Sequence, residues 1–511
     1  MSELKGIAQQ VLLVILDGFG INDNTIKNAV RDARKPTIDE LFSHYPFTTI
    51  EAGGLSVGLP KGVPGNSEVG HMNLGAGKPV RQDLVRINEA IQDHSFANLP
   101  LLKELCNVAD KKTKRIHIMG LLSDGGVHSH IDHLIESVQA IQSHGDFEIF
   151  FHAFMDGRDT APDCGSKYVE EVLKLKGCHF ASMQGRSIGM DRDRRWDKIE
   201  KAYRMMTGEG QTTDQAPLEY LKSEYKSGRL DEFVNPVLFK KEYAIKNDDC
   251  IFFINFRPDR AIQITLAFMD PKFKEFSRTV TPGYFLCMTP YVPDEVSLPI
   301  LFDKERIPGG LSEYLSQNGM AQFKIAETEK YAHVTYFFNG GEKKPFPKEK
   351  QVLIPSPKEV ATYDLKPEMS ARQVTEKLIE ALDDNTYKFY LVNFANGDMV
   401  GHTGNYNAAV EAVQILDECL AKLAKKCAEK NILMMITADH GNCDQMVYPD
   451  GVPHTSHTGA PVPFCIVHPK LKDKKIPLSE GHLALKDVAS TVLYSLGITI
   501  PNNFEGSPIF K

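Results

Sequence analysis

The chain has 511 residues, of which 42% are hydrophobic and 25% are charged. This composition is typical of a soluble globular protein, and the length exceeds what one hydrophobic core usually supports, so we expect at least two domains. The formal net charge of -8 argues against nucleic acid as the main partner. A bound anion must therefore be held by a local group of basic side chains.

The first ten residues, MSELKGIAQQ, are polar and lack the apolar stretch of a signal peptide. The longest apolar runs, such as VLLVIL at 11–16, are too short to span a bilayer. The nine cysteines form no CxxC pair, which favours reduced intracellular thiols over a disulfide framework. These features predict a cytoplasmic protein without a membrane partner, and we expect a monomer.

Short apolar runs alternate with amphipathic helical stretches along most of the chain. The runs lack polar alternation and predict buried parallel strands at 11–16, 116–122, 149–155, 179–184, 251–256, 389–394 and 432–437. Apolar residues at steps of three or four predict helices after the second run, closed by Gly145, over 410–423, and over 488–496 with Gly497 as its cap. Alternating strands and helices predict an α/β fold with a mostly parallel sheet covered on both faces.

Acidic and imidazole side chains follow three of these predicted strands. They are Asp17 after 11–16, Asp398 and His402 after 389–394, and Asp439, His440 and His457 after 432–437. Because ligands bind beyond the carboxyl ends of parallel strands, we expect these groups to meet in one negatively charged site that needs cations. Carboxylate and imidazole ligands suit Mn²⁺ or Zn²⁺ better than Mg²⁺, and six groups suffice for two ions. The alternative for each aspartate is a helix N-cap.

A glycine-rich segment, GVPGNSEVGHMNLGAG at 62–77, supplies a candidate nucleophile. Its Gly and Pro residues predict a tight turn that places Ser67 where a helix begins. Free N–H groups at a helix N-terminus stabilise a phosphoryl group, and metal coordination can activate a serine hydroxyl. The alternative is that Ser67 only caps the helix, with Glu68 in its first turn.

Basic side chains follow the predicted strands of the central segment. Arginine binds phosphate and carboxylate in a bidentate manner, so a convergence of arginines suggests a substrate that carries both groups. The candidates are Arg158, Arg186, Arg192, Arg257 and Arg260. We expect Arg257 and Arg260 to be buried near a ligand, whereas Arg194 and Arg195 belong to a solvated face. His128 and Asp159 occupy comparable positions and could bind hydroxyls or move protons.

The motifs GNSEVGHMNLGAG, LLSDGGVHSH, DGRDT, NFRPDRA, ETEKYAHVTYFF, GDMVGHTG and TADHGN occur in this order. Together they resemble the cofactor-independent phosphoglycerate mutases, which are grouped with alkaline phosphatase and the sulfatases. The resemblance extends from Asp17 to His457. It implies a discontinuous metal-binding, phosphatase-like domain at 1–80 and 306–511, with a smaller α/β substrate-binding domain inserted at 81–305.

The resemblance also implies roles for individual residues. One Mn²⁺ would be bound by Asp17, Ser67, Asp439 and His440, and a second by Asp398, His402 and His457; Mg²⁺, Co²⁺ or Zn²⁺ are alternatives. Ser67 would carry the phosphoryl group. Our own candidate for the general acid and base at the substrate hydroxyls is Asp159, with His128 as a binding partner, and the assignment between these two residues stays open. Substrate contacts would be made by His128, Arg158, Asp159, Arg186, Arg192, Arg257, Arg260 and Lys330.

The activity that the resemblance implies is interconversion of 3-phosphoglycerate and 2-phosphoglycerate, in glycolysis and gluconeogenesis, without 2,3-bisphosphoglycerate. The chain departs from the family at Gly397, where proline is frequent, and at Ser456, where alanine is usual; neither change removes a ligand. Alternatives on the same core are a phosphatase, phosphodiesterase or sulfatase, or another phosphomutase such as a phosphopentomutase. Another alternative is a catalytically silent metal-binding or scaffold protein on this fold. Such a protein would lack the nucleophile or one of the metal ligands, and none of these residues is missing from this chain.

Overall fold

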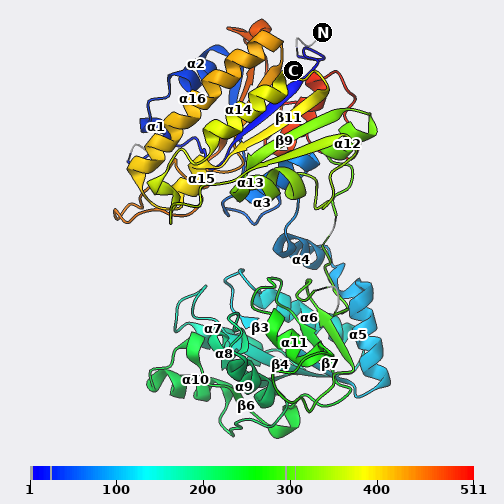
Figure 1. The fold of residues 1–511 in the computed structure, drawn as a ribbon. Helices are drawn as coiled ribbons and strands as arrows, with labels where there is room; N and C mark the ends of the chain where they lie inside the picture. The colour runs from blue at the N-terminus through cyan, green and yellow to red at the C-terminus, as the bar shows by residue number, and fades with distance from the viewer. Residues whose placement is uncertain (1–3, 24–25, 294–295, 305) are drawn as a thin grey trace. The chain divides into compact units, whose positions relative to one another are not determined.

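The computed structural model describes residues 4–23, 26–293, 296–304 and 306–511. The chain forms two compact units, Met1–Gln82 with Arg306–Lys511 and Asp83–Glu305. Each unit contains one mostly parallel β-sheet with helices packed on it (Figure 1). The α/β class predicted from the sequence is therefore confirmed.

The first unit is built on a seven-stranded sheet in the order β10-β9-β11-β1-β12-β13-β2. The strands β10, β9, β11, β1 and β12 run parallel, and β13 is antiparallel to both of its neighbours. Their bounds are β1 (Val11–Leu16), β2 (Phe47–Ile50), β9 (Ala321–Glu327), β10 (Glu349–Ile354), β11 (Tyr387–Phe394), β12 (Leu433–Thr437) and β13 (Val462–Val467). The predicted strands at 11–16, 389–394 and 432–437 are thus confirmed.

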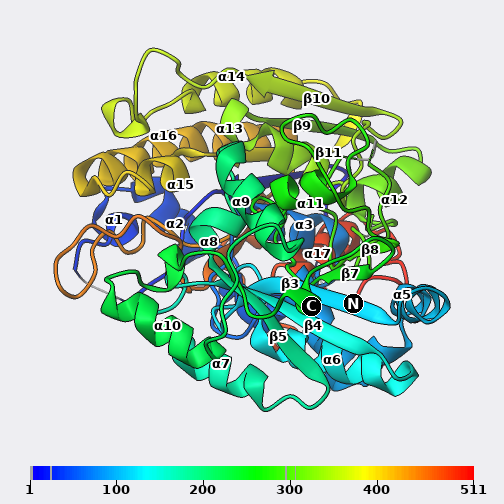
Figure 2. The same cartoon turned by 90° about the horizontal axis from the view of Figure 1, so that it is seen from below.

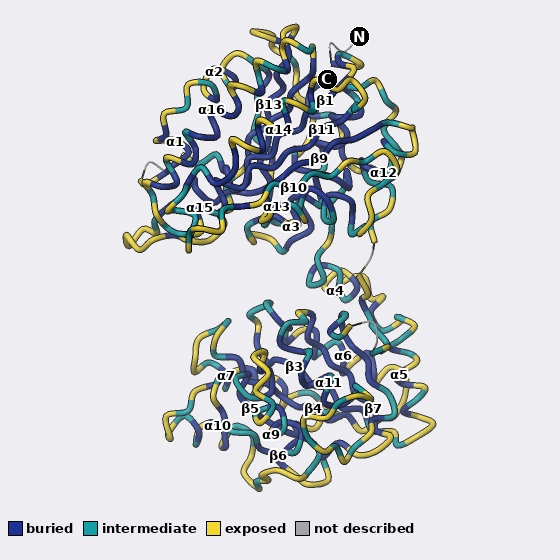
Figure 3. Tube along the Cα trace, viewed as in Figure 1, coloured by how far each residue is buried: buried dark blue, intermediate teal, exposed yellow. Residues whose placement is uncertain are grey.

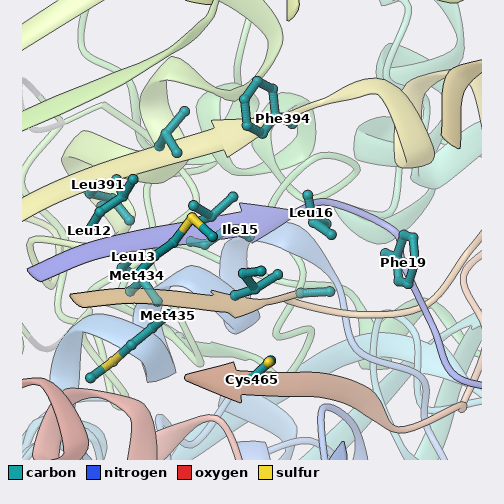
Figure 4. Packing of buried hydrophobic residues seen from close by; sticks show 14 of the residues in the cluster. Leu12, Leu13, Ile15, Leu16, Phe19, Leu391, Phe394, Met434, Met435 and Cys465 are labelled. Carbon is teal, nitrogen blue, oxygen red and sulfur yellow. The ribbon is translucent and has the colours of Figure 1, made fainter. Parts of the chain in front are cut away.

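The apolar hexapeptide VLLVIL forms β1, the central strand of this unit. All six of its residues are buried, and it pairs with β11 on one side and β12 on the other. Figure 4 shows side chains from these three strands packed together, among them Leu12, Leu391 and Met434. Helices α14 (Ala371–Leu382) and α16 (Tyr406–Lys430) pack on each other and on the sheet. A strand buried on both faces has no polar alternation, as its sequence predicted.

The second unit contains a six-stranded sheet in the order β6-β5-β4-β3-β7-β8, parallel except for β6. Figure 2 shows β3, β4 and β5 side by side, with α6 and α7 alongside. The bounds are β3 (Arg115–Leu122), β4 (Glu148–Met155), β5 (Cys178–Gly185), β6 (Val237–Leu238), β7 (Cys250–Phe253) and β8 (Tyr284–Cys287), with α6 at Ile131–His144 and α7 at Gly165–Leu173. Gly145 follows α6 as predicted.

Both faces of the second sheet are covered by hydrophobic cores. Alternate residues of β3 enter different clusters: Ile116 and Ile118 lie in one, whereas Met119 and Leu121 lie in the other. Figure 3 shows buried residues along the strands of each unit and exposed residues in the outer loops and helix faces. Among the described residues, no helix combines the length and apolar character needed to cross a bilayer.

Candidate metal centre and arginine cluster

Four adjacent parallel strands of the first unit lead to one group of charged side chains. In the order β9-β11-β1-β12, these strands are followed by Lys330, Asp398, Asp17 and Asp439. Asp17 comes directly after β1, Asp439 follows β12 after one alanine, and Asp398 lies in helix α15 (Asn396–Gly401). Because parallel strands end at the same sheet edge, their carboxylates converge there.

Ser67 is the first residue of helix α3 (Ser67–Ala76), but it does not cap that helix. The cap is Asn66, whose side chain accepts a hydrogen bond from the backbone N–H of Val69 at 3.0 Å. The alternative assignment of Ser67 as the N-cap is therefore wrong. Its Oγ atom instead lies 2.9 Å from His440 Nε2 and 3.3 Å from Asp17 Oδ1. The hydroxyl is thus free for chemistry at a helix N-terminus.

Lys330, in helix α13 (Thr328–Ala332), joins the serine to two carboxylates. Its Nζ atom lies 2.6 Å from Ser67 Oγ, 2.8 Å from Asp17 Oδ1 and 2.6 Å from Asp398 Oδ2. Burial would lower the pKa of Lys330, but the surrounding aspartates, Asp17 foremost, hold it above its ordinary value. Burial raises the pKa of Asp398, yet the adjacent ammonium and imidazoles hold it well below its usual range.

A second group of imidazoles surrounds the same Asp398 carboxylate. His402 Nε2 and His457 Nε2 lie 3.1 Å and 3.3 Å from Asp398 Oδ1, and 3.1 Å from each other. The hydrogen bond to Asp398 raises the pKa of His402. The two histidines line an open cavity of about 370 Å³, together with the segment Pro64–Asn66 that precedes the nucleophile. Solvent therefore reaches the site from the histidine side.

The donor set fits divalent cations. Among the described residues, Asp398, His440 and His457 form one group with metal-ligand spacing, and Asp17, His71 and Asp439 form another. Three buried carboxylates and the single ammonium of Lys330 leave a formal charge of -2, which bound cations would neutralise. Asp439 Oδ2 is buried and makes no hydrogen bond of regular geometry with any described residue. A buried carboxylate oxygen without a regular hydrogen bond, such as Asp439 Oδ2, is available as a ligand for a cation.

The N-cap alternative is wrong for all three aspartates, and for Asp439 because the next element of the chain is strand β13 rather than a helix. The Asp17 side chain bonds to the side chains of Ser67, Lys330 and Asn393 rather than to the backbone N–H groups of a helix start. Asp398 lies inside α15, and helices α15 and α16 have other caps. Gly397 lies next to Asp398, and a Cβ atom there would lie 2.6 Å from the backbone oxygen of Asp17. Close approach of two chain segments, rather than a loose turn, is the setting of this glycine.

The predicted substrate residues of the second unit also follow its strands. Asp156 and Arg158 follow β4, Arg186 follows β5, and Arg257 follows β7. Arg186 is 1% exposed, and its Nη1 atom lies 2.6 Å from Asp156 Oδ1 and 2.5 Å from Asp159 Oδ2. These contacts form the buried half of an arginine cluster at the carboxyl edge of the sheet.

Asp259 organises the other half of this cluster. Its carboxylate lies 3.2 Å from Arg192 Nη1, 3.1 Å from Arg257 Nε and 3.7 Å from His128 Nδ1. Burial, and then the charge of Arg186, lowers the pKa of His128 to about 4, so its ring is neutral at neutral pH. A neutral imidazole can exchange hydrogen bonds with a substrate hydroxyl without carrying charge.

Of the two arginines predicted to be buried, Arg257 and Arg260, the structure buries only Arg260. Arg260 is buried, as predicted, and its Nη1 donates to the backbone oxygen of Met190 at 3.1 Å. Burial and then the charge of Arg186 lower its pKa, with further lowering by Arg192 and Arg158. The prediction that Arg257 is buried is wrong, because 49% of its side chain is exposed; its Nε atom is paired with Asp259. The cluster thus combines buried guanidinium groups, such as that of Arg260, with exposed ones, such as that of Arg257.

Sequence reasoning missed five polar side chains that support these groups: His71, Asp156, Asp259, Asn393 and Asn442. Asn393 donates to Asp17 Oδ2 at 2.7 Å, and Asn442 donates to Asp398 Oδ1 at 2.9 Å. Signals existed for two of them. Asp156 directly follows a strand, as Asp17 does, and His71 lies one helical turn after Ser67.

Comparisons with known proteins agree with this site. The Metalloenzyme superfamily matches residues 9–500 of the chain. A 2,3-bisphosphoglycerate-independent phosphoglycerate mutase from Clostridium novyi is 47% identical, over 98% of this chain and 99% of the relative. One from Myxococcus xanthus is 45% identical, over 96% and 97%. A crystal structure of Leishmania mexicana phosphoglycerate mutase at low cobalt concentration has a TM-score of 0.65 and 32% identity, covering 98% of both chains.

These matches span nearly the whole chain and both of its units. The resemblance stated from the motifs is therefore confirmed. The chain belongs to the metalloenzyme superfamily and, within it, to the 2,3-bisphosphoglycerate-independent phosphoglycerate mutases.

Proposed function

We propose that this chain interconverts 3-phosphoglycerate and 2-phosphoglycerate through a phosphoserine on Ser67, with two divalent cations and without 2,3-bisphosphoglycerate. The observation that carries the proposal is the convergence of a helix-terminal serine hydroxyl with Lys330 Nζ, His440 Nε2 and Asp17 Oδ1 within 3.3 Å. The printed names of whole-length relatives support the substrate pair.

Two sets of ligands are proposed. One ion would be bound by Asp17, Ser67, Asp439 and His440, and the other by Asp398, His402 and His457. Mn²⁺ is the proposed ion because the sets mix carboxylate with imidazole, and Mg²⁺, Co²⁺ and Zn²⁺ are the alternatives. When bound, such ions supply Lewis-acid stabilisation of the negative charge on the phosphoryl oxygens.

The chain's own residues prepare Ser67 for attack. His440 Nδ1 lies 3.1 Å from the backbone oxygen of Gly441 and donates to it, which leaves Nε2, 2.9 Å from Ser67 Oγ, as the ring nitrogen that would bind the same ion as the serine. Lys330 donates to the same Oγ atom, which favours its ionised form. The free N–H groups in the first turn of α3 favour the phosphoryl group once it is attached to the serine.

The arginine cluster is proposed to hold glycerate between the two transfers. Arginine forks suit the glycerate carboxylate, and neutral His128 suits a hydroxyl. In the first transfer, Ser67 reacts as the alkoxide, having released its proton to solvent beforehand: its Oγ bonds to phosphorus, the bond to the 3-oxygen breaks, and Asp159 gives that oxygen a proton. In the second, the 2-hydroxyl gives its proton to Asp159 and takes the phosphoryl group from Ser67. Reorientation of bound glycerate between these steps completes the isomerisation.

A cytoplasmic location and a monomeric state remain predictions that accompany this proposal. The location follows from the sequence features described above, and the monomeric state is an expectation only.

The test is an assay with 3-phosphoglycerate as the only phosphorylated compound, followed by separate measurement of 2-phosphoglycerate and free phosphate. We expect 2-phosphoglycerate as the main product, loss of activity with a chelator, and recovery with Mn²⁺. Free phosphate as the main product would overturn the proposal in favour of a phosphatase. Activity that requires added 2,3-bisphosphoglycerate would overturn it as well.

A further inference from the structure

His71 lies beside the proposed metal ligands without having been assigned a role. It is completely buried in α3, one turn after Ser67, and its Nδ1 atom lies 2.8 Å from the backbone oxygen of Ser67. The same Nδ1 atom lies 3.2 Å from Asp439 Oδ2. Its spacing to Asp17 and Asp439 would also suit a metal ligand. The question is therefore whether the imidazole binds an ion or positions the groups that do.

The hydrogen bonds of Asn393 identify the tautomer of His71. The Asp17 carboxylate can only accept, so the amide nitrogen of Asn393, 2.7 Å from Asp17 Oδ2, must face it. The same nitrogen lies 3.0 Å from His71 Nε2, which therefore accepts its second proton. His71 Nδ1 then carries the hydrogen and donates to the Ser67 carbonyl. Both ring nitrogens are thus occupied, whereas a metal ligand needs a free lone pair.

We propose that His71 and Asn393 form a positioning pair that orients Asp17, Asp439 and the backbone of Ser67 for one of the two proposed ions. Three groups from distant parts of the chain are connected through two uncharged side chains, both 0% exposed. Asn393 also lies in β11, paired with Ile15 of β1, so it connects two of the four strands that lead to the site. This inference rests on the proposed two-ion centre, but its test needs no substrate.

Asn442 provides a matched comparison for the other ion. Its side-chain nitrogen donates to Asp398 Oδ1 at 2.9 Å, and it is as buried as Asn393. It contacts a carboxylate assigned to the second set of ligands and lies outside the His71–Asn393 pair. A general loss of stability would affect both ions equally, whereas positioning predicts separate effects.

The experiment titrates Mn²⁺ into metal-free protein by calorimetry for wild type, His71→Phe, His71→Asn, Asn393→Ala and Asn442→Ala. We expect His71→Phe and Asn393→Ala each to weaken one binding event by about 10–100-fold, the usual cost of removing an outer-shell partner. The double variant His71→Phe/Asn393→Ala should be no weaker than either alone, because the two residues act as one unit. His71→Asn keeps a donor near the position of Nδ1 and should recover part of the affinity.

Combining His71→Phe with Asn442→Ala should instead weaken both binding events, with additive effects. Complete loss of one ion in His71→Phe, while Asn393→Ala binds as wild type, would overturn the proposal and make His71 a ligand. Unchanged affinities in folded variants, checked by circular dichroism, would overturn it too. Mutase activity is measured separately, so a failure of the proposed reaction would leave these titrations interpretable.

The NMR signals of the histidine ring nitrogens supply a second readout. In protein labelled with ¹⁵N-histidine, the His71 ring should show the Nδ1–H tautomer both without metal and with Mg²⁺, because its nitrogens stay with Ser67 and Asn393. A ligand would show a large shift of one ring nitrogen on metal binding. Such a shift at His71 would contradict the positioning role.

Discussion

The Nζ atom of Lys330 lies 2.6 Å from the Oγ atom of Ser67, inside a site where three carboxylates are buried. The lysine thus does two things at once: it donates to the nucleophile, and it offsets the charge of Asp17 and Asp398. The second role overlaps with that of a bound cation. The stability of the folded protein should therefore depend on Lys330 more strongly without metal than with metal bound.

Replacing Lys330 by methionine should destabilise the metal-free first unit by about 3–5 kcal/mol, because it leaves buried carboxylates without their partner. Saturating Mn²⁺ should narrow the difference between variant and wild type, because the bound ions supply positive charge to the carboxylates that the variant leaves unpaired. Thermal unfolding in chelator and in Mn²⁺ measures both values. Trp196, the only tryptophan, lies in the second unit and reports its unfolding as an internal control. Equal destabilisation under both conditions would contradict the overlap of roles.

Replacing Ser67 by alanine should abolish isomerisation, with a loss of roughly 10⁶-fold typical for removal of a catalytic nucleophile. Metal content should stay nearly intact, because the charged ligands remain. Acid-quenched wild type incubated with ³²P-labelled 3-phosphoglycerate should yield a labelled peptide containing Ser67. Ser56→Ala, in the preceding 3₁₀ turn, is the matched control and should keep both activity and label. Turnover that persists in Ser67→Ala would reject the phosphoserine.

Replacing Asp159 by asparagine should lower kcat by about 10²–10⁴-fold, the usual contribution of a general acid or base. The KM should change much less, because Arg186 keeps its 2.6 Å contact with Asp156. Steady-state kinetics in both directions separates the two effects. Asp163→Asn removes an exposed acid from the same loop and should behave as wild type. A large rise in KM with kcat unchanged would make Asp159 a binding group only.

The second unit should lose stability in mild acid. Two buried histidines, His117 and His152, are hydrogen-bonded to each other at 2.9 Å, with Asp249 and Ser182 at the two ends of the chain of bonds. Burial lowers the pKa of both imidazoles. The folded state therefore binds protons at these imidazoles less readily than the unfolded chain, whose histidines have a pKa of about 6.5, so stability falls as pH falls below that value.

The expected loss is about 1 kcal/mol between pH 6.5 and 5.5 for His152, whose pKa lies well below its ordinary value, and His117 adds a loss of the same sign. Urea unfolding followed by Trp196 fluorescence in chelator measures it, and His152→Leu should remove about that much of the pH dependence. His94→Asn removes an exposed imidazole from the same unit and should leave the dependence unchanged. A His152→Leu variant with the pH dependence of wild type would contradict the linkage.

The strands that were predictable are those made of uninterrupted apolar residues. β9 was not predicted because Lys324 stands in its middle, although its ammonium is fully buried 3.2 Å from Glu349 Oε1 and bonded to Ser312. A lysine in a sequence usually indicates a solvent-exposed position. Lys324 can be buried because Glu349 of β10 pairs with its charge. β13 escaped prediction for a different reason, since Pro463 interrupts a short run.

The candidate ligands were predictable because each follows a strand, and strand ends meet at one edge. Lys330 was named only through the family resemblance, because a lysine after a strand has no chemistry that its sequence position reveals. Asn393 was hidden differently, as one polar letter inside the apolar run FYLVNF. Its partners, Asp17 and His71, are more than 300 residues away in sequence. Long-range partners of this kind need coordinates.

The division of the first unit between the two ends of the chain has a consequence for biosynthesis. β1 must wait for β11 and β12, its partners on either side, before it can enter a sheet. During translation, residues 83–305 emerge complete while VLLVIL is still exposed to solvent. The inserted unit can therefore fold while translation continues, whereas β1 stays without both of its sheet partners until synthesis has passed Thr437, the last residue of β12.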